Sequence, residues 1–353
     1  MTHRERFFNV VTHQKSDRAV FDLCGCPQTQ IYNPSLITED FLIKYEIDTR
    51  IVGGMPTPQT KNNRIEGDIG YDSYGIGYKR LNGYSEICVN PLRDKNIDEI
   101  LSHPMPDAEN IDISIIKKWA EKAEYLHKNT DFAVIAEHPV LGVFELGCWM
   151  FGFDDYLYRL AAEPETVHAF SEKILKYQKR MIELYYGELG RFIDCTTSGD
   201  DFGTQTGMFM SCKMFNDLIK PYFKERIGYT KKYTNAFYQH HTCGSVFELI
   251  PSLIDCGVDI LNPIQPGTYQ MEPERLKQNY GNDMTFWGGI DTQHLLLEKT
   301  AEEIKTEVKR ILSIMGEEGY ILAPAHNIQP DIPFENLEAV YIGAAEYYKE
   351  KWK

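Results

Sequence analysis

The sequence predicts an α/β protein, a (β/α)8 TIM barrel with a β-hairpin insertion between its second and third strands. Three observations predict this fold. Short apolar runs typical of strands alternate with stretches of helical period along the chain, and there are eight such runs. No glycine-rich phosphate-binding turn is present, as an open doubly wound sheet would require. No linker, repeat or low-complexity tract divides residues 1–353, so we expect a single barrel domain.

Each expected strand is a short run rich in β-branched, aromatic and other apolar side chains, as buried parallel strands are. In chain order the eight runs are Ala19–Leu23, Ile47–Val52, Phe132–Glu137, Phe192–Thr197, Phe237–His241, Val258–Leu261, Thr285–Trp287 and Tyr320–Ala323.

Apolar residues at helical spacing fill most of the intervals between these strands. The expected helices are Ile111–Lys128, Glu165–Gly187, Cys212–Thr234, Gly244–Cys256, Ala301–Gly316 and Phe334–Tyr348. The interval between the second and third strands is too long for one helix. Its aromatic and glycine-rich part, Asp72–Val89, predicts the hairpin insertion.

Composition and charge exclude several classes of protein. With 42% hydrophobic residues the chain is too apolar to be disordered. A formal charge of -15 repels phosphate backbones, so we expect no nucleic-acid partner. No run approaches the roughly 18 apolar residues of a membrane span, and the start, MTHRERFFNVVTHQKSDR, is too polar for a signal peptide. We therefore expect a cytoplasmic protein without a membrane partner, whose eight scattered cysteines are reduced.

Polar residues follow most of the expected strands, at the end of the barrel where active sites form. These residues are Cys24-Gly-Cys26, Glu137-His138, Ser198-Gly-Asp200-Asp201, His241-Thr-Cys243, Asn262-Pro-Ile-Gln265, Asp291-Thr-Gln293 and His326-Asn327. Among them we expect substrate to be bound by Glu137, His138, Asn262, Gln265 and Asp291.

The pair His241 and Cys243 carries the most specific chemistry. Residues two apart on extended backbone point to the same side, so an imidazole and a thiolate can reach one cation. Closure of the barrel brings His326, after the last strand, close to them. These three ligands with one position left open are typical of catalytic zinc. The alternative is that Cys243 packs as a small apolar residue while the histidines hydrogen-bond within the mouth. His240 should face the opposite way and be structural.

Asp200 and Asp201 are adjacent acids after a buried strand, and we expect a catalytic role there. One should orient a ligand while the other caps a turn or helix start, because neighbouring residues leaving a strand face opposite ways. Cys24 and Cys26 are also two apart and could bind a metal or a redox partner, although a role in the core or in lining the mouth suits them better.

Several motifs together resemble the uroporphyrinogen decarboxylase superfamily, which includes the heme-pathway decarboxylase and the cobalamin-linked methyltransferases of corrinoid proteins. The resemblance covers nearly the whole chain and implies a single (β/α)8 barrel. Its motifs are Arg4-Glu-Arg6-Phe with Ser16-Asp-Arg18, Asp200-Asp-Phe-Gly-Thr204, His241-Thr-Cys-Gly244, Trp287-Gly-Gly-Ile-Asp291, and Pro324-Ala-His326 with Pro333-Phe-Glu-Asn336.

Two segments depart from the decarboxylase pattern. Its Arg-Gln-Ala-Gly-Arg segment after the first strand is replaced by Cys24-Gly-Cys-Pro-Gln-Thr29, which contains no cation. Its acidic residue after the second strand is replaced by Gly53-Gly-Met-Pro-Thr57. Arginine supplies bidentate recognition of carboxylates, so we expect that uroporphyrinogen is not the substrate.

The insertion around Asp72-Ser-Tyr-Gly75 and the His-x-Cys pattern resemble the methyltransferase branch more closely, whose members use zinc to bind and deprotonate a thiol. The third zinc ligand of that branch is usually a cysteine, where this chain has His326. The resemblance thus implies zinc, a small methyl donor or acceptor, and a corrinoid carried by a partner protein that docks at the mouth. A homodimer is compatible with it.

Two other functions remain open. The first is a decarboxylase-like lyase acting on a tetrapyrrole or on a smaller carboxylated substrate, in which Asp200 or Asp201 binds NH groups or acts as an acid. The second is a barrel that binds a ligand without catalysis, although the clustering of titratable groups at the mouth argues against it.

Overall fold

Eight parallel strands form the central sheet of the computed structural model, which describes residues 1–23, 33–81 and 84–353. In space the order is β1-β12-β11-β10-β9-β8-β7-β2, so the strands from β2 to β12 lie in the order of the chain and β1 lies beside the last of them. The strands are β1 (Val20–Phe21), β2 (Thr49–Gly53), β7 (Ala133–Glu137), β8 (Cys195–Gly199), β9 (Phe237–His241), β10 (Ile260–Ile264), β11 (Thr285–Ile290) and β12 (Tyr320–Pro324).

The two end strands of this order, β1 and β2, meet and close the ring. The N–H of Asp48, just before β2, donates to the carbonyl oxygen of Phe21 at 2.9 Å. The hydroxyl of Thr49 donates to the carboxylate of Asp22, which also accepts from the indole N–H of Trp287 at 3.1 Å. The predicted (β/α)8 TIM barrel is therefore confirmed.

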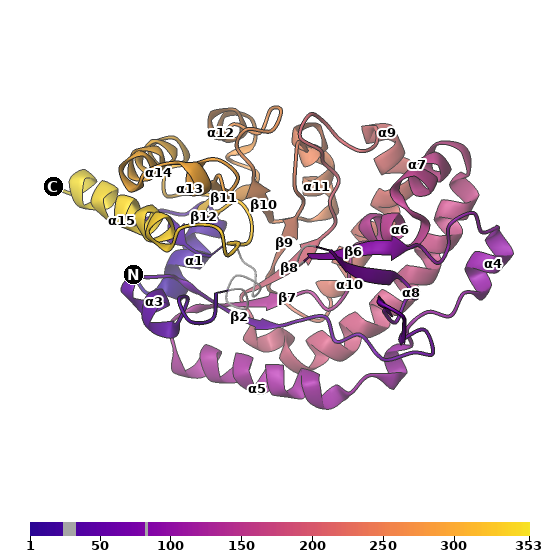
Figure 1. The fold of residues 1–353 in the computed structure, drawn as a ribbon. Coiled ribbons are helices and arrows are strands. Elements are labelled where there is room, and N and C mark those ends of the chain that lie inside the picture. Colours follow the sequence, from indigo (N-terminus) through magenta and orange to yellow (C-terminus); the bar gives the residue numbers. More distant parts are fainter. Residues whose placement is uncertain (24–32, 82–83) are drawn as a thin grey trace.

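Helices surround the barrel (Figure 1). In chain order they are α3 (Glu39–Lys44), α4 (Ile97–Ser102), α5 (Ile113–Asn129), α6 (Val143–Phe151), α7 (Phe153–Ala162), α8 (Pro164–Leu189), α9 (Cys212–Met214), α10 (Lys220–Thr230), α11 (Ile250–Cys256), α12 (Pro273–Tyr280), α13 (Leu295–Glu298), α14 (Ala301–Met315) and α15 (Phe334–Lys351). Within the described ranges, none of these helices is long and apolar enough to cross a membrane.

Three of the predicted elements differ from the observed ones because a turn or a loop replaces part of them. The strand expected at Phe192–Thr197 begins only at Cys195, because residues 190–192 form a 3-10 turn. The helix expected at Gly244–Cys256 begins at Ile250, because Gly244 has a left-handed φ of 81° and belongs to a loop. The helix expected at Cys212–Thr234 is interrupted by a π-helical turn between α9 and α10.

The amino end of the barrel is closed by α1 (His3–Val11). Its Phe7 and Val10 are fully buried in one cluster with inward-facing side chains of the strands, including Ile135 and Trp287. Burying these side chains removes apolar surface of both α1 and the strands from water, which holds the helix against the barrel. The amino end of the described barrel is thus filled by a packed core.

A buried carboxylate joins the amino-terminal segment to the barrel. Asp48 is fully buried and accepts from the guanidinium groups of Arg6 at 2.6 Å and Arg18 at 2.7 Å. It also accepts from the backbone N–H of Phe21 and hydrogen-bonds to the His3 ring, both at 2.7 Å. Because the two cations and Asp48 lie out of water, each depends on the others for solvation.

The insertion between β2 and β7 forms a separate antiparallel sheet in the order β3-β4-β5-β6. Its strands are β3 (Arg64–Glu66), β4 (Ile69–Tyr71), β5 (Gly77–Leu81) and β6 (Tyr84–Val89). The predicted hairpin corresponds to β5 and β6. Asn90, just after β6, donates to the carbonyl oxygen of Trp149 in α6 at 2.7 Å, which ties the insertion to the carboxyl end of the barrel.

Candidate metal and substrate site

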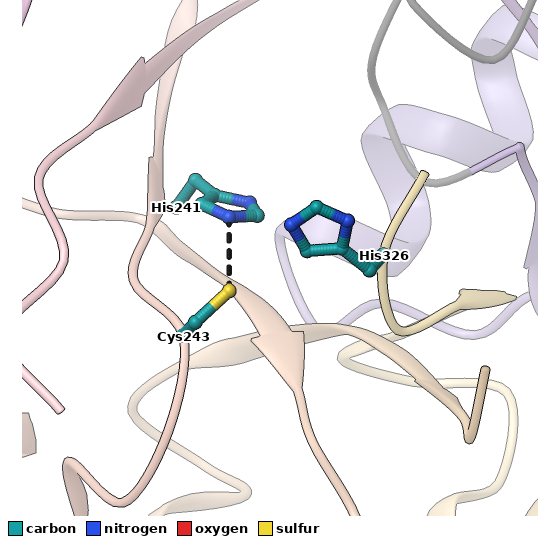
Figure 2. Close-up of side chains that lie close together, drawn as sticks. All are labelled: His241, Cys243 and His326. Carbon is teal, nitrogen blue, oxygen red and sulfur yellow. Dashed lines mark hydrogen bonds between the residues drawn. The ribbon is translucent and has the colours of Figure 1, made fainter. Parts of the chain in front are cut away.

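Three side chains from two distant parts of the chain converge at the mouth of the barrel (Figure 2). His241 ends β9, Cys243 follows two residues later, and His326 follows β12. The Nε2 of His241 lies 3.3 Å from the Sγ of Cys243, and one ligand atom from each residue lies within 4.8 Å of the others. The structure therefore brings together the three residues expected to bind a metal.

A neighbouring strand fixes the orientation of the His241 ring. Asn262, fully buried on β10, directs its side-chain amide N–H toward the carbonyl oxygen of Trp287 at 3.5 Å, so its Oδ1 faces His241. The Nδ1–H of His241 donates to that oxygen at 2.7 Å. The proton on Nδ1 leaves the lone pair of Nε2 facing the thiol, as metal-binding histidines require. Asn262, expected to bind substrate, therefore also positions the His241 ring.

The loops after β8 and β9 lie against each other with backbone in contact. A Cβ on Gly203 would approach the carbonyl oxygen of Cys243 to 2.5 Å, and one on Gly244 would approach the backbone of Gly203 as closely. The N–H of Ser245 donates to the carbonyl oxygen of Thr204 at 2.8 Å. These two glycines allow the contact that places the acids of one loop beside the ligands of the other.

The adjacent acids Asp200 and Asp201 face different surroundings. Asp201 is partly exposed at the mouth, accepts from the backbone N–H of Cys243 at 2.8 Å, and lies 4.0 Å from the Nε2 of His241. Asp200 is buried and accepts from the N–H groups of Phe144 at 3.2 Å and Glu145 at 2.7 Å, at the start of α6. Asp200 is thus placed as a helix cap, and Asp201 next to the metal ligands.

Glu145, whose role was not expected from the sequence, lies close to these acids. Burial, and then the charges of Asp201 and Asp200, raise the pKa of Glu145 to about 8. Burial also raises the pKa of Asp200 to about 6, although the charge of the buried Arg226 opposes this. Glu145 could have been found from the sequence, because it is the one charged residue in the apolar run Val143–Phe151.

Burial shifts the pKa values of two of the candidate ligands, His326 and Cys243. Desolvation, and then the neighbouring His241, lower the pKa of His326, so its imidazole is neutral at neutral pH. Burial, together with the charges of Asp201 and Glu145, raises the pKa of the Cys243 thiol. The thiol of Cys243 is therefore protonated until a cation binds, and metal binding would release its proton.

A cavity of about 730 Å³ opens beside Cys243 and His326. It is lined by the loops that follow β8 to β12, and Gln265 and Asp291 belong to its wall. Gln265 accepts from the N–H of Gly244 at 2.9 Å, and Asp291 accepts from the N–H groups of Gln293 and His294 at 2.8 and 3.1 Å. Both residues thus border the space where a substrate would meet the metal.

Glu137, His138 and His240 do not belong to the wall of this cavity. Glu137 is largely buried at the end of β7, and burial raises its pKa. His138, also expected to bind substrate, is buried, and its ring lies 3.3 Å from the hydroxyl of Thr230 on α10. Alternation along β7 turns it away from the mouth. His240 is likewise fully buried, as expected. Cys24 and Cys26 lie outside the described residues, and the six described cysteines are free.

These positions predict different effects for the two acids. Asp200→Asn should lower the free energy of unfolding by about 1–3 kcal/mol, because it weakens buried hydrogen bonds to the start of α6. Asp201→Asn keeps an acceptor for the Cys243 N–H but removes a charge beside His241. It should lower zinc affinity roughly tenfold with little change in stability. Urea denaturation and zinc titration of both variants measure this, and equal losses of stability with unchanged zinc affinity would contradict it.

A family model and two known proteins match parts of this chain. Residues 89–347 match the family model described as Uroporphyrinogen decarboxylase (URO-D). Over 136 residues the chain is 27% identical to the Methylcobamide:CoM methyltransferase MtaA of Methanosarcina barkeri and equally to that of its strain Fusaro. The match covers 38% of this chain and 38% of each of these relatives, so the chain spans well under half of their length in it.

A solved structure resembles the whole fold. The methyltransferase from Methanosarcina mazei superposes with a TM-score of 0.68 and covers 99% of this chain and 99% of its own. The two sequences are 15% identical, so this likeness establishes the shared barrel architecture.

Proposed function

Because the chain belongs to the uroporphyrinogen decarboxylase family, we propose that it is a zinc-dependent methyltransferase component within that family. It transfers a methyl group between a corrinoid protein and a small donor or acceptor such as a thiol. The observation that carries the proposal is the convergence of His241, Cys243 and His326 on one wall of an open cavity. The match to the Methanosarcina barkeri methyltransferase and the full-length likeness to a methyltransferase structure support it.

The donor types of all three side chains fit zinc, and so does the spacing of His241 and Cys243. Tetrahedral zinc with bonds of about 2.0 Å to nitrogen and 2.3 Å to sulfur separates two such ligands by about 3.5 Å. The separation between His241 Nε2 and Cys243 Sγ is 3.3 Å. Two imidazoles and one thiolate are ligands that zinc accepts, and an exposed position toward the cavity is left for a substrate. A histidine in the third position is therefore chemically compatible with the metal.

Zinc in this position would lower the pKa of a substrate thiol, so that the thiolate exists at neutral pH. The residues of the chain have separate tasks around it. Asn262 holds the His241 ring in one orientation and one tautomer. Asp201 places a negative charge near the ligands and positions the Cys243 backbone. Glu145, with a pKa of about 8, can hold a proton or give it up close to neutral pH.

The corrinoid in this proposal is carried by a separate protein. The sequence of this chain lacks the Asp-x-His-x-x-Gly pattern expected of such a carrier. The loops after β8 to β12 surround the cavity and are the surface on which the carrier would dock. We also propose that residues 1–353 act as one barrel domain, which the 99% coverage of a single barrel structure supports.

The test combines metal analysis with two assays on the full chain. We expect close to one zinc ion per chain after loading, and transfer of the methyl group of methylcobalamin to a small thiol. We expect no decarboxylation of uroporphyrinogen, because none of the described residues lining the cavity is a Lys or Arg that could bind its carboxylates. Absence of zinc, or decarboxylation at about one turnover per second or faster, would contradict the proposal.

A further inference from the structure

The charge around the cavity distinguishes between classes of substrate. The loops that follow β8 to β12 comprise residues 200–211, 242–246, 265–272, 291–294 and 325–333, and their sequences contain no Lys or Arg. They contain the acids Asp200, Asp201, Glu272, Asp291 and Asp331. Segments 24–32 and 82–83 also contain no Lys or Arg in the sequence, so neither supplies a cation.

Two acids belong to the cavity wall itself. The carboxylate of Asp291 accepts backbone N–H groups, which partly compensate its charge. Asp331 is exposed on the wall. Asp201 adds a third carboxylate beside the ligands, 4.0 Å from His241. A cleft lined by one sign of charge concentrates ligands of the opposite sign and repels those of the same sign.

We propose that this cavity selects a substrate without a negative charge, neutral or cationic, and discriminates against sulfonates, carboxylates and phosphates. The inference rests on the proposed function in one respect: it takes the cavity beside the three ligands as the place where the methyl donor or acceptor binds. A metal would bind the thiolate of each thiol, so compounds without a thiol isolate the preference for the charge of the remaining molecule. The cavity, with a volume of about 730 Å³, admits molecules considerably larger than a two-carbon thiol.

The size of the effect follows from Coulomb's law. At an effective dielectric constant of about 20, one unit charge about 12 Å from another changes an affinity roughly tenfold. A substrate head group beside the wall that carries Asp331 lies within about 12 Å of at least one carboxylate. We therefore expect at least about a tenfold difference between an anionic and a neutral head group at low ionic strength.

Two matched series of probes test this with the zinc-loaded full chain. The first comprises three two-carbon thiols that differ in the head group: 2-aminoethanethiol, 2-mercaptoethanol and 2-mercaptoethanesulfonate. The second comprises three methylated compounds without a thiol: choline, 2-methoxyethanol and methoxyacetate. Titration calorimetry gives the affinity of each. The anionic member of each series should bind at least about tenfold more weakly than the other two, and the difference should shrink as salt is added.

A pair of variants assigns the preference to the cavity. Asp331→Asn removes one charge from the wall and should reduce the ratio of cation to anion affinity several-fold. Asp283→Asn makes the same change of net charge just before β11, at the opposite end of the barrel, and should leave the ratio unchanged. An equal effect of both variants would show that net charge, and not this wall, sets the preference, and would overturn the inference.

The remaining outcomes separate this inference from the proposed function. Equal or tighter binding of the sulfonate and the methoxyacetate overturns the inference and leaves the zinc site standing. If no member of either series binds while zinc stays bound, the cavity is not the substrate site, and the inference is overturned. If the chain binds no zinc, the proposed function fails, and the second series, which needs no metal–thiolate bond, still gives the order of affinities that decides the inference.

Discussion

Cys243→Ala should lower methyl-transfer turnover by about 10³-fold or more while the fold stays intact. The thiol lies 3.3 Å from His241 Nε2, and no described residue other than His326 joins this pair as a third ligand. Without Cys243 two imidazoles remain, which hold zinc poorly at a site with an open position. Losing a metal that stabilises charge in the transition state costs several kcal/mol, and each 1.36 kcal/mol is a factor of ten in rate.

The control for this substitution is Cys88→Ala, at an exposed position on the insertion sheet. The free energy of unfolding of both variants, measured without zinc, should lie within about 1 kcal/mol of that of the unmodified chain, since neither substitution removes a large buried side chain. Zinc content and turnover should fall together in Cys243→Ala and remain unchanged in Cys88→Ala. Turnover within tenfold of the unmodified chain after zinc is lost would mean that the metal ligands were wrongly assigned.

Asp48→Asn should lower the free energy of unfolding by about 3–5 kcal/mol, because it leaves two buried guanidinium groups without their shared carboxylate. The control is Asp17→Asn. Asp17 also pairs with Arg6, at 2.7 Å, but its side chain is 44% exposed, so we expect a loss of about 0–1 kcal/mol. Denaturant unfolding at neutral pH measures both, and comparable losses would contradict the assignment of Asp48 as the centre of the cluster.

The pH dependence provides a second measurement of the same cluster. Burial alone would raise the pKa of Asp48, but the charge of Arg18, the hydrogen bond with His3 and the charge of Arg6 outweigh it and lower that pKa. A carboxyl whose pKa is lower in the folded chain stabilises the fold fully at pH values above its pKa in the unfolded chain, about 4. This stabilisation is lost as the pH falls through the lower pKa of the folded chain. The stability difference between the unmodified chain and Asp48→Asn should therefore be constant near neutrality and narrow in acid.

The barrel could be predicted from the sequence because its strands are buried on both faces and therefore appear as continuous apolar runs. Strand ends were less well predicted. Phe192 is as apolar as the strand it precedes, and only the backbone turn at residues 190–192 separates them. Helices α6 and α7 were not predicted. The mainly apolar run Val143–Phe151 shows no clear polar face, because most of its side chains are buried.

Some features of the candidate site could likewise be predicted from the sequence, and others could not. The convergence of His241, Cys243 and His326 follows from local alternation and from closure of the barrel, both of which the sequence determines. The partners of Asp200 do not follow from it, because they lie on a helix more than fifty residues earlier in the chain. Glu145 was missed for the same reason, and the burial of His138 against Thr230 of α10 likewise depends on a contact between residues distant in the chain.

The paired loops after β8 and β9 also determine how the site can move. Cys243 is joined to Asp201 through its backbone N–H, and Ser245 is joined to Thr204 through backbone atoms. Since glycine backbones touch between these attachments, one loop has no room to slide over the other. We therefore expect any shift of Cys243 to carry Asp201 along with it, so that the thiol and the neighbouring carboxylate keep their spacing.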